Sequence, residues 1–232
     1  MKKLLFVALL AVGLTANAEQ RMNNGDSEDK KDSSIPTKIE KGPWSAHLSI
    51  GVDIPVSVPD GIDFAPFRSW DINWTVLQYN LLHKMENQDL FIGVGLNWRN
   101  YTLKHDEEHM FYKVNDVVGV GTGNFDDLSS RIHTMAISVP VLFKQKLGGD
   151  LAFSVGGQVN FNVIGELHNS YEDGDDDISV ETGKIGQRPV TVDVIGILHI
   201  DDLGIYCKYS PMSVLKKDRD PEFQSLSVGL YF

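Results

Sequence analysis

The sequence contains a single cysteine, Cys207, so the chain cannot form an internal disulfide. It also has no apolar run that reaches the roughly 20 residues of a membrane-spanning helix. Positive charge is scarce as well: 21 Lys and Arg stand against 32 Asp and Glu, which gives a formal net charge of −11. A nucleic-acid partner needs a basic face, so we predict no nucleic-acid binding. If this chain crosses a membrane, it does so with strands.

The N-terminus has the pattern of a secretory signal peptide. Lys2 and Lys3 precede an apolar run over residues 4–14, and Ala16-Asn17-Ala18 forms a small-x-small cleavage pattern. We predict a signal peptide over residues 1–18, and the alternative is an N-terminal membrane anchor. No cysteine follows the cut, which disfavours a lipoprotein. Removing two lysines changes the formal charge from −11 to −13, so anionic lipid head groups would repel the chain unless divalent cations bridge them.

Residues 19–43 form a polar leader that includes a run without any apolar residue, 23–34. Such a segment cannot bury enough apolar surface to fold. We interpret residues 19–43 as a disordered periplasmic arm, with a partner-binding tail as the alternative. The remainder, residues 44–232, has the length of one sizeable domain.

From Trp44 onward the hydrophobic pattern has a period of two, which is typical of β-strands. Residues 151–163 show it most clearly, because Phe153 and Val155 alternate with Ser154 and other small or polar residues. The pattern predicts eight strands, at 44–53, 68–81, 90–99, 134–143, 151–163, 190–200, 203–210 and 225–232. The connections between them alternate between long and short, as the external loops and periplasmic turns of outer-membrane barrels do.

The two faces of these strands differ in a way that favours an inside-out barrel. The non-apolar face is rich in Gly, Ser, Ala, Asn and Gln, which suits the crowded interior of a small barrel. Its few charges have both signs: Asp53, Asp71, Arg99, Asp193 and Lys208. The apolar face ends in aromatic residues: Trp44, Trp70, Trp98, Phe143, Tyr209 and Phe232. We therefore predict an all-β, eight-stranded antiparallel up-and-down transmembrane β-barrel, whose interior is too narrow for a diffusion pore.

The last strand, 225–232, ends the chain on Phe232 with no polar tail. It resembles the C-terminal strand by which bacterial outer-membrane barrels are recognised for insertion. Together with Tyr209-Ser210-Pro211-Met212-Ser213, it gives residues 44–232 a resemblance to outer-membrane β-barrel families of Bacteroidota, including the PorT-like group. The resemblance implies a Gram-negative outer membrane, lipids and the barrel-insertion machinery as partners, and in some members a role in secretion. The matching motifs carry over no catalytic residue.

Candidate chemistry is sparse. His47, Asp193 and His199 share the predicted inward face, but no spacing selects a serine to complete a triad. The acidic segment 172–177 offers carboxylates for calcium but does not fit an EF-hand; the alternative is a solvated, mobile loop. The glycine-rich segment 119–123 lacks a phosphate-loop lysine and is interpreted as a flexible loop tip. Cys207 falls on the lipid face, as an inert apolar residue.

We therefore predict no catalytic, cofactor-binding or metal-binding residue, and a structural or interaction role through the long loops or the N-terminal arm. Two alternatives stay open. An enzyme acting on outer-membrane lipid would place catalytic groups near the outer leaflet, where Arg131 and His133 are expected. A secreted soluble barrel that binds a small ligand would need an apolar interior instead.

Overall fold

The computed structural model describes residues 43–104, 109–115, 117–123, 126–174, 176–217 and 221–232. The predicted signal peptide and all of the predicted arm except Pro43 lie outside the described residues. Within the described part of the chain, no helix is long and apolar enough to cross a membrane.

The described residues form strands and one short 3-10 helix, η1 (Pro66–Arg68). The strands are β1 (Trp44–Val56), β2 (Trp70–Asn80), β3 (Gln88–Thr102), β4 (His109–Val114), β5 (Val117–Thr122), β6 (Asp126–Gly148), β7 (Leu151–Asp173), β8 (Asp176–Gly183), β9 (Val190–Ile200), β10 (Leu203–Ser210) and β11 (Gln224–Tyr231).

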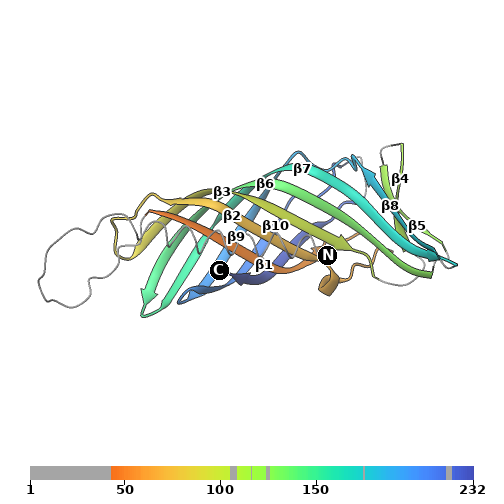
Figure 1. Cartoon of the computed structure of the whole chain (residues 1–232). Coiled ribbons are helices and arrows are strands. Elements are labelled where there is room, and N and C mark those ends of the chain that lie inside the picture. The colour runs from red at the N-terminus through yellow and green to blue at the C-terminus, as the bar shows by residue number, and fades with distance from the viewer. Residues whose placement is uncertain (1–42, 105–108, 116, 124–125, 175, 218–220) are drawn as a thin grey trace, which may run out of the picture. The chain divides into compact units, whose positions relative to one another are not determined.

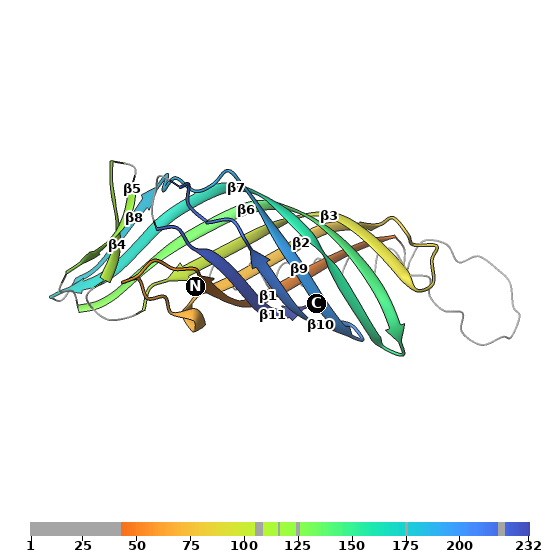
Figure 2. The same cartoon turned by 180° about the vertical axis from the view of Figure 1, so that it is seen from behind.

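Eight of these strands close into a ring. The hydrogen-bonded order is β6-β3-β2-β1-β11-β10-β9-β7, and an additional β6–β7 pairing joins its two ends. Every pairing is antiparallel, and apart from the closing pair β1–β11, ring neighbours follow one another in chain order. Figures 1 and 2 show the tilted strands of this ring from opposite sides. The predicted eight-stranded antiparallel up-and-down barrel is confirmed.

The two ends of the ring differ. At one end, here called the turn end, short turns join β2 to β3, β6 to β7 and β9 to β10. The last of these is the two-residue turn Asp201–Asp202, in which Asp201 has φ 58°, a conformation that Asp tolerates better than most residues. At the other end, the loop end, the connections are longer and contain η1, β4, β5 and β8.

Two bulges shift the alternation that the sequence pattern suggests. The β2–β3 register changes between Thr75 and Leu77, so that Val76 and Leu77 both face outward, with 43% and 45% of their surface exposed. A second shift, where Met135 pairs with Ile164 and Ala136 with Asn162, leaves Val163 and Ile164 both outward. Each bulge inserts one residue, and the inward face therefore continues on the opposite parity.

The predicted long loops contain far more strand than expected. β6 begins at Asp126 and β7 runs to Asp173, so these two strands continue well past the loop end of the ring, and β8 pairs with the extension of β7. The glycine-rich segment 119–123, predicted as a flexible loop tip, instead lies mostly in β5. Gly119 and Gly121 leave room there for the ring of Tyr112 on β4, which an added Cβ would meet at 2.6 and 3.0 Å. That cross-strand contact was not visible from spacing.

Candidate functional site

The centre of the barrel interior is a buried network of charges. Arg99 on β3 donates from Nε to Asp71 Oδ1 (3.2 Å), from Nη2 to Asp193 Oδ2 (2.5 Å) and from Nη1 to Ser210 Oγ (3.0 Å). Lys208 on β10 pairs with Asp71, with Nζ 2.7 Å from Oδ2. Since β2, β3, β9 and β10 supply these side chains, the network ties strands on opposite parts of the ring to one another.

Amides and hydroxyls complete most of this network. Asp71 also accepts from Asn97 Nδ2 (2.8 Å) and from the hydroxyl of Tyr206 (2.9 Å). Asp193 also accepts from Asn160 Nδ2 (2.7 Å) and from Ser210 Oγ. The predicted inward placement of the five charges is confirmed, because each side chain is almost fully buried in the ring. The geometry stabilises charge and leaves no oxygen of Asp71 or Asp193 open to solvent.

Asp53 is the exception. It is fully buried on β1, yet neither carboxylate oxygen has a hydrogen-bond partner among the described residues, and nor does the hydroxyl of Ser227, its partner in the β1–β11 register. Three carboxylates therefore face two cations, Arg99 and Lys208. The sequence identified Asp53 as inward but gave no sign that it would lack a partner.

Apolar layers lie on both sides of the charges. Toward the loop end is the apolar plug, defined as Tyr101, Leu103, Phe111, Val118, Ile132, Leu167, Ile185, Val214, Leu215 and Phe223. Toward the turn end lie Leu142, Ile195, Ile197, Tyr206 and Tyr231. Between this second layer and Lys208 is a cavity of about 20 Å³, room for one water molecule. Within the described residues, the interior is thus packed with side chains rather than open as a channel.

The histidine and aspartate candidates do not form a triad. His199 Nε2 lies 2.7 Å from Ser154 Oγ, whereas Asp193 is held by Arg99 in the central network. His47 and His199 do approach the same group, since the ring of Tyr231 stacks on His47 (centroids 5.0 Å apart) and meets His199 edge-on (5.6 Å). Ser154 is only 2% exposed and His199 only 7%, so both side chains of this pair are buried in the barrel. Sequence spacing did not select Ser154, because the contact joins two strands.

Of the acidic segment 172–177, Asp175 lies outside the described residues. Glu172 at the end of β7 pairs with Asp177 of β8, and Gly174 between the two strands has φ 68°. Among the described residues, no group of three or more His, Cys, Asp or Glu side chains is placed to hold a metal ion. Cys207 is exposed on the outward face of β10, as predicted.

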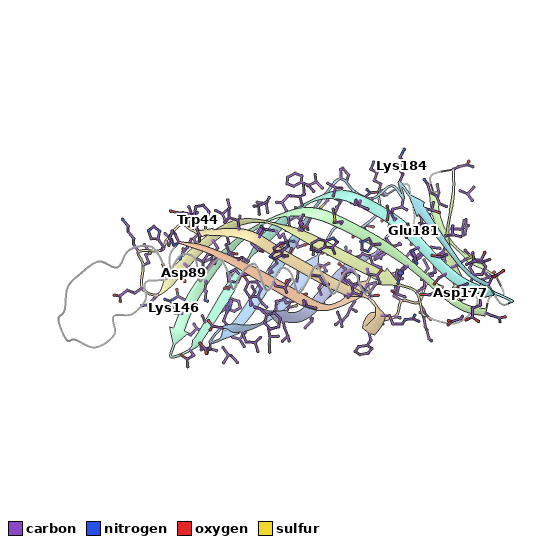
Figure 3. The ribbon with its side chains drawn as sticks, viewed as in Figure 1. Trp44, Asp89, Lys146, Asp177, Glu181 and Lys184 are labelled. Atoms are coloured by element: carbon purple, nitrogen blue, oxygen red, sulfur yellow. The ribbon has the colours of Figure 1, made fainter. Side chains whose placement is uncertain are left out.

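The extensions of β6 and β7 form, with β8, a sheet that projects beyond the ring (Figure 1). The β4–β5 hairpin docks on its inner side: the amide of Phe111 donates to Ser130 Oγ (2.8 Å), and Asn169 Nδ2 donates to the carbonyl of Phe111 (2.8 Å). Asp177, Glu181 and Lys184 lie at this end of the molecule, and Trp44, Asp89 and Lys146 lie at the opposite end (Figure 3). In the described chain, the second edge of β8 is unpaired.

Arg131 and His133 face outward from β6, because their neighbours Ile132 and Thr134 are buried inside. His133 lies beside the outward-facing Trp70, with ring centroids 6.0 Å apart. No described serine, cysteine or carboxylate is hydrogen-bonded to His133 in a nucleophile–base arrangement.

The closed ring and its inward charges define the class: an eight-stranded antiparallel β-barrel with a polar, packed interior. No family model matches the sequence. No curated protein matches it either. Among solved structures, the chain is similar to Ail, the attachment invasion locus protein of Yersinia pestis, at 10% identity and a TM-score of 0.34, over 83% of this chain and 99% of that one. The class rests on the hydrogen-bonded ring itself.

Proposed function

We propose that this chain is an integral outer-membrane protein whose sealed barrel anchors the projecting β6–β7–β8 sheet at the cell surface for contact with a partner. The observation that carries the proposal is the reversal of faces: charges and amides are buried inside, while aliphatic side chains are exposed outside. Outward-facing aliphatic side chains with about half of their surface exposed occur around the ring, among them Ile50, Val94, Val141, Val155, Val194, Ile205 and Leu230. Water would penalise such a continuous apolar surface, whereas hydrocarbon accepts it.

The height of this apolar belt supports the same proposal. Its ends carry aromatic side chains, with Trp44 against Tyr79 near the turn end (centroids 4.7 Å apart) and Trp70 near the loop end. From Trp70 to Tyr79, β2 is roughly 30 Å long, and a strand tilt of about 40° corresponds to a height of roughly 23 Å along the barrel axis. A bacterial outer-membrane barrel has an apolar band of about 25 Å between its aromatic girdles.

A matched pair of substitutions tests the belt. Val194 and Val180 are 52% and 46% exposed on strands, but Val194 lies midway along β9 in the ring and Val180 on the projecting β8. We expect Val194→Arg to lower the free energy of unfolding in phosphatidylcholine vesicles by about 2–4 kcal/mol, and Val180→Arg to change it by less than about 0.5 kcal/mol. Urea titrations that follow the heat-modifiable band measure both. Equal effects would argue against a membrane belt.

Two exposed lysines at opposite ends test the orientation. Lys184 follows β8 and Lys146 lies at the turn end of β6 (Figure 3). We expect a membrane-impermeant amine reagent to label Lys184, but not Lys146, on intact cells, and both after lysis. Labelling of Lys146 alone would reverse the proposed orientation, and labelling of neither in an outer-membrane fraction would argue against surface display.

The remaining functional expectations stay predictions. The PorT-like resemblance implies a role in secretion, but no described side chain points to that role in particular. The absence of enzymatic activity is likewise a prediction: an unchanged lipid profile after His133→Ala would support it, and an altered profile would favour the lipid-modifying alternative.

A further inference from the structure

We infer that Arg68 and Arg131 form a site on the outer wall of the barrel for the phosphate of an outer-leaflet lipid head group. The inference rests on the proposed membrane location and adds to it a ligand class and two residues. It concerns a surface that the interior network does not touch.

The two arginines come from different elements and meet around one residue of β3. Arg68 ends η1, and its carbonyl oxygen accepts hydrogen bonds from Thr102 Oγ1 (3.1 Å) and Asn100 Nδ2 (3.4 Å). Thr102 is in turn the register partner of Arg131 on β6. Thr102 thereby brings the half-buried Arg131 and the exposed Arg68 to the same part of the outer wall. The fold therefore holds two cations together at this point.

Neither arginine of the pair has an ion-pair partner in the described chain. Neither guanidinium donates a hydrogen bond to another described residue. Glu181 on β8 attracts Arg131, but its carboxylate lies 3.3 Å from Nδ1 of His168. The chain has a formal net charge of −11, yet these two neighbouring arginines form no ion pair in its described part. The planar forks of two guanidinium groups are suited to the oxygens of one phosphate.

The position of the pair selects a lipid rather than a dissolved phosphate. Trp70, at the edge of the apolar belt, lies two residues after Arg68. Phe67, directly before Arg68, is 93% exposed. The turn that carries Phe67 is held in place, because the amide and the hydroxyl of Ser69 both donate to the carbonyl of Ala65 (3.0 Å each). An aromatic ring held outward beside a girdle tryptophan fits the boundary between head groups and acyl chains, and a free phosphate would give it no role.

The test uses the full chain refolded in phosphatidylcholine vesicles that contain brominated phosphatidic acid, whose head group is a phosphate monoester. Quenching of the tryptophans gives the affinity for phosphatidic acid relative to phosphatidylcholine. We expect a clear preference in the unsubstituted chain, and a loss of roughly fivefold for each of Arg68→Gln and Arg131→Gln. The matched control is Lys216→Gln, which removes one positive charge, as each arginine variant does, from an exposed loop-end position.

Several results would overturn the site. One is that the unsubstituted chain shows no preference for phosphatidic acid over phosphatidylcholine. Another is that the lysine control loses as much affinity as the arginine variants do, which would show a general charge effect. A preference abolished by chelating divalent cations would indicate cation bridging, and one abolished by excess inorganic phosphate would indicate a free-phosphate site. A preference that resists both additions but needs both arginines supports the proposal. If the chain gives no heat-modifiable band in these vesicles, the membrane location fails and this site with it; a normal band without lipid preference overturns the site alone.

Discussion

Two buried regions fill the barrel in opposite ways. The central network is built of charges that satisfy one another, with Asp71 and Asp193 joined through Arg99. The apolar plug at the loop end is built of packed rings, with Phe223 between Phe64 (centroids 4.9 Å) and Tyr101 (5.0 Å). The network is supplied by ring strands alone, whereas the plug combines ring strands with the β4–β5 hairpin and loop residues.

The difference shows what each region depends on. A buried charge is stable only while its partner is present, so the network is sensitive to the loss of any one member. An apolar cluster depends on volume and tolerates substitutions that preserve it. We therefore expect changes in the network to weaken the whole barrel, and changes in the plug to act first on the loop-end structures.

The largest effect is expected from Arg99→Met. This substitution keeps much of the side-chain volume but leaves the buried carboxylates of Asp71 and Asp193 without their shared cation. We expect the free energy of unfolding to fall by about 3–5 kcal/mol, measured by urea titration of the heat-modifiable band. Lys217→Met, at an exposed loop-end position, is the control and should change it by less than about 0.5 kcal/mol. Similar small losses in both would mean that the network contributes little.

Phe223→Ala should act on the plug. Phe223 is 1% exposed, and truncating it leaves a cavity between two aromatic neighbours, at a cost of about 3 kcal/mol. Because the plug holds the β4–β5 hairpin, we expect faster hydrogen exchange at amides of β4 and β5, while ring amides such as those of β9 stay protected. Phe223→Leu, which restores much of the volume, should lose only about 1 kcal/mol. Faster exchange throughout the ring would contradict this separation.

The regular part of this comparison could be predicted from the sequence. The alternation of apolar and polar residues is unbroken in two strands, 190–200 and 203–210, and the predicted bounds agree with those in the structure. The same alternation correctly predicted that Asp193 and Lys208 face inward. A period of two belongs to a single strand, so it can be recognised without knowing which strands lie beside it. The bulges near Thr75 and Ile164 are different, because the extra residue is defined by the pairing between two strands.

The loop-end structures were missed for a related reason. β5 reads Val-Val-Gly-Val-Gly-Thr, in which the glycines suggest a flexible loop until Tyr112 is placed across them. The pairing of Ser154 with His199, and the way Thr102 links Arg68 to Arg131, also join strands or elements far apart in the chain. Contacts of this kind come from ring closure and register, which no single segment encodes.

The smallest effect, and the one with the opposite sign, is expected at Asp53. Its carboxylate is buried without a hydrogen-bond partner beside a network in which carboxylates outnumber cations by three to two. Asp53→Asn removes the excess negative charge and breaks no hydrogen bond of the described structure, so stability should stay level or rise by about 1 kcal/mol. Asp71→Asn is the matched control: Arg99 and Lys208 would lose their shared carboxylate, and stability should fall by about 3 kcal/mol. Urea titrations at one pH and salt concentration compare the two. If Asp53→Asn is as destabilising as Asp71→Asn, then Asp53 is a charged and paired member of the network, and the contrast between a balanced network and one surplus carboxylate is wrong.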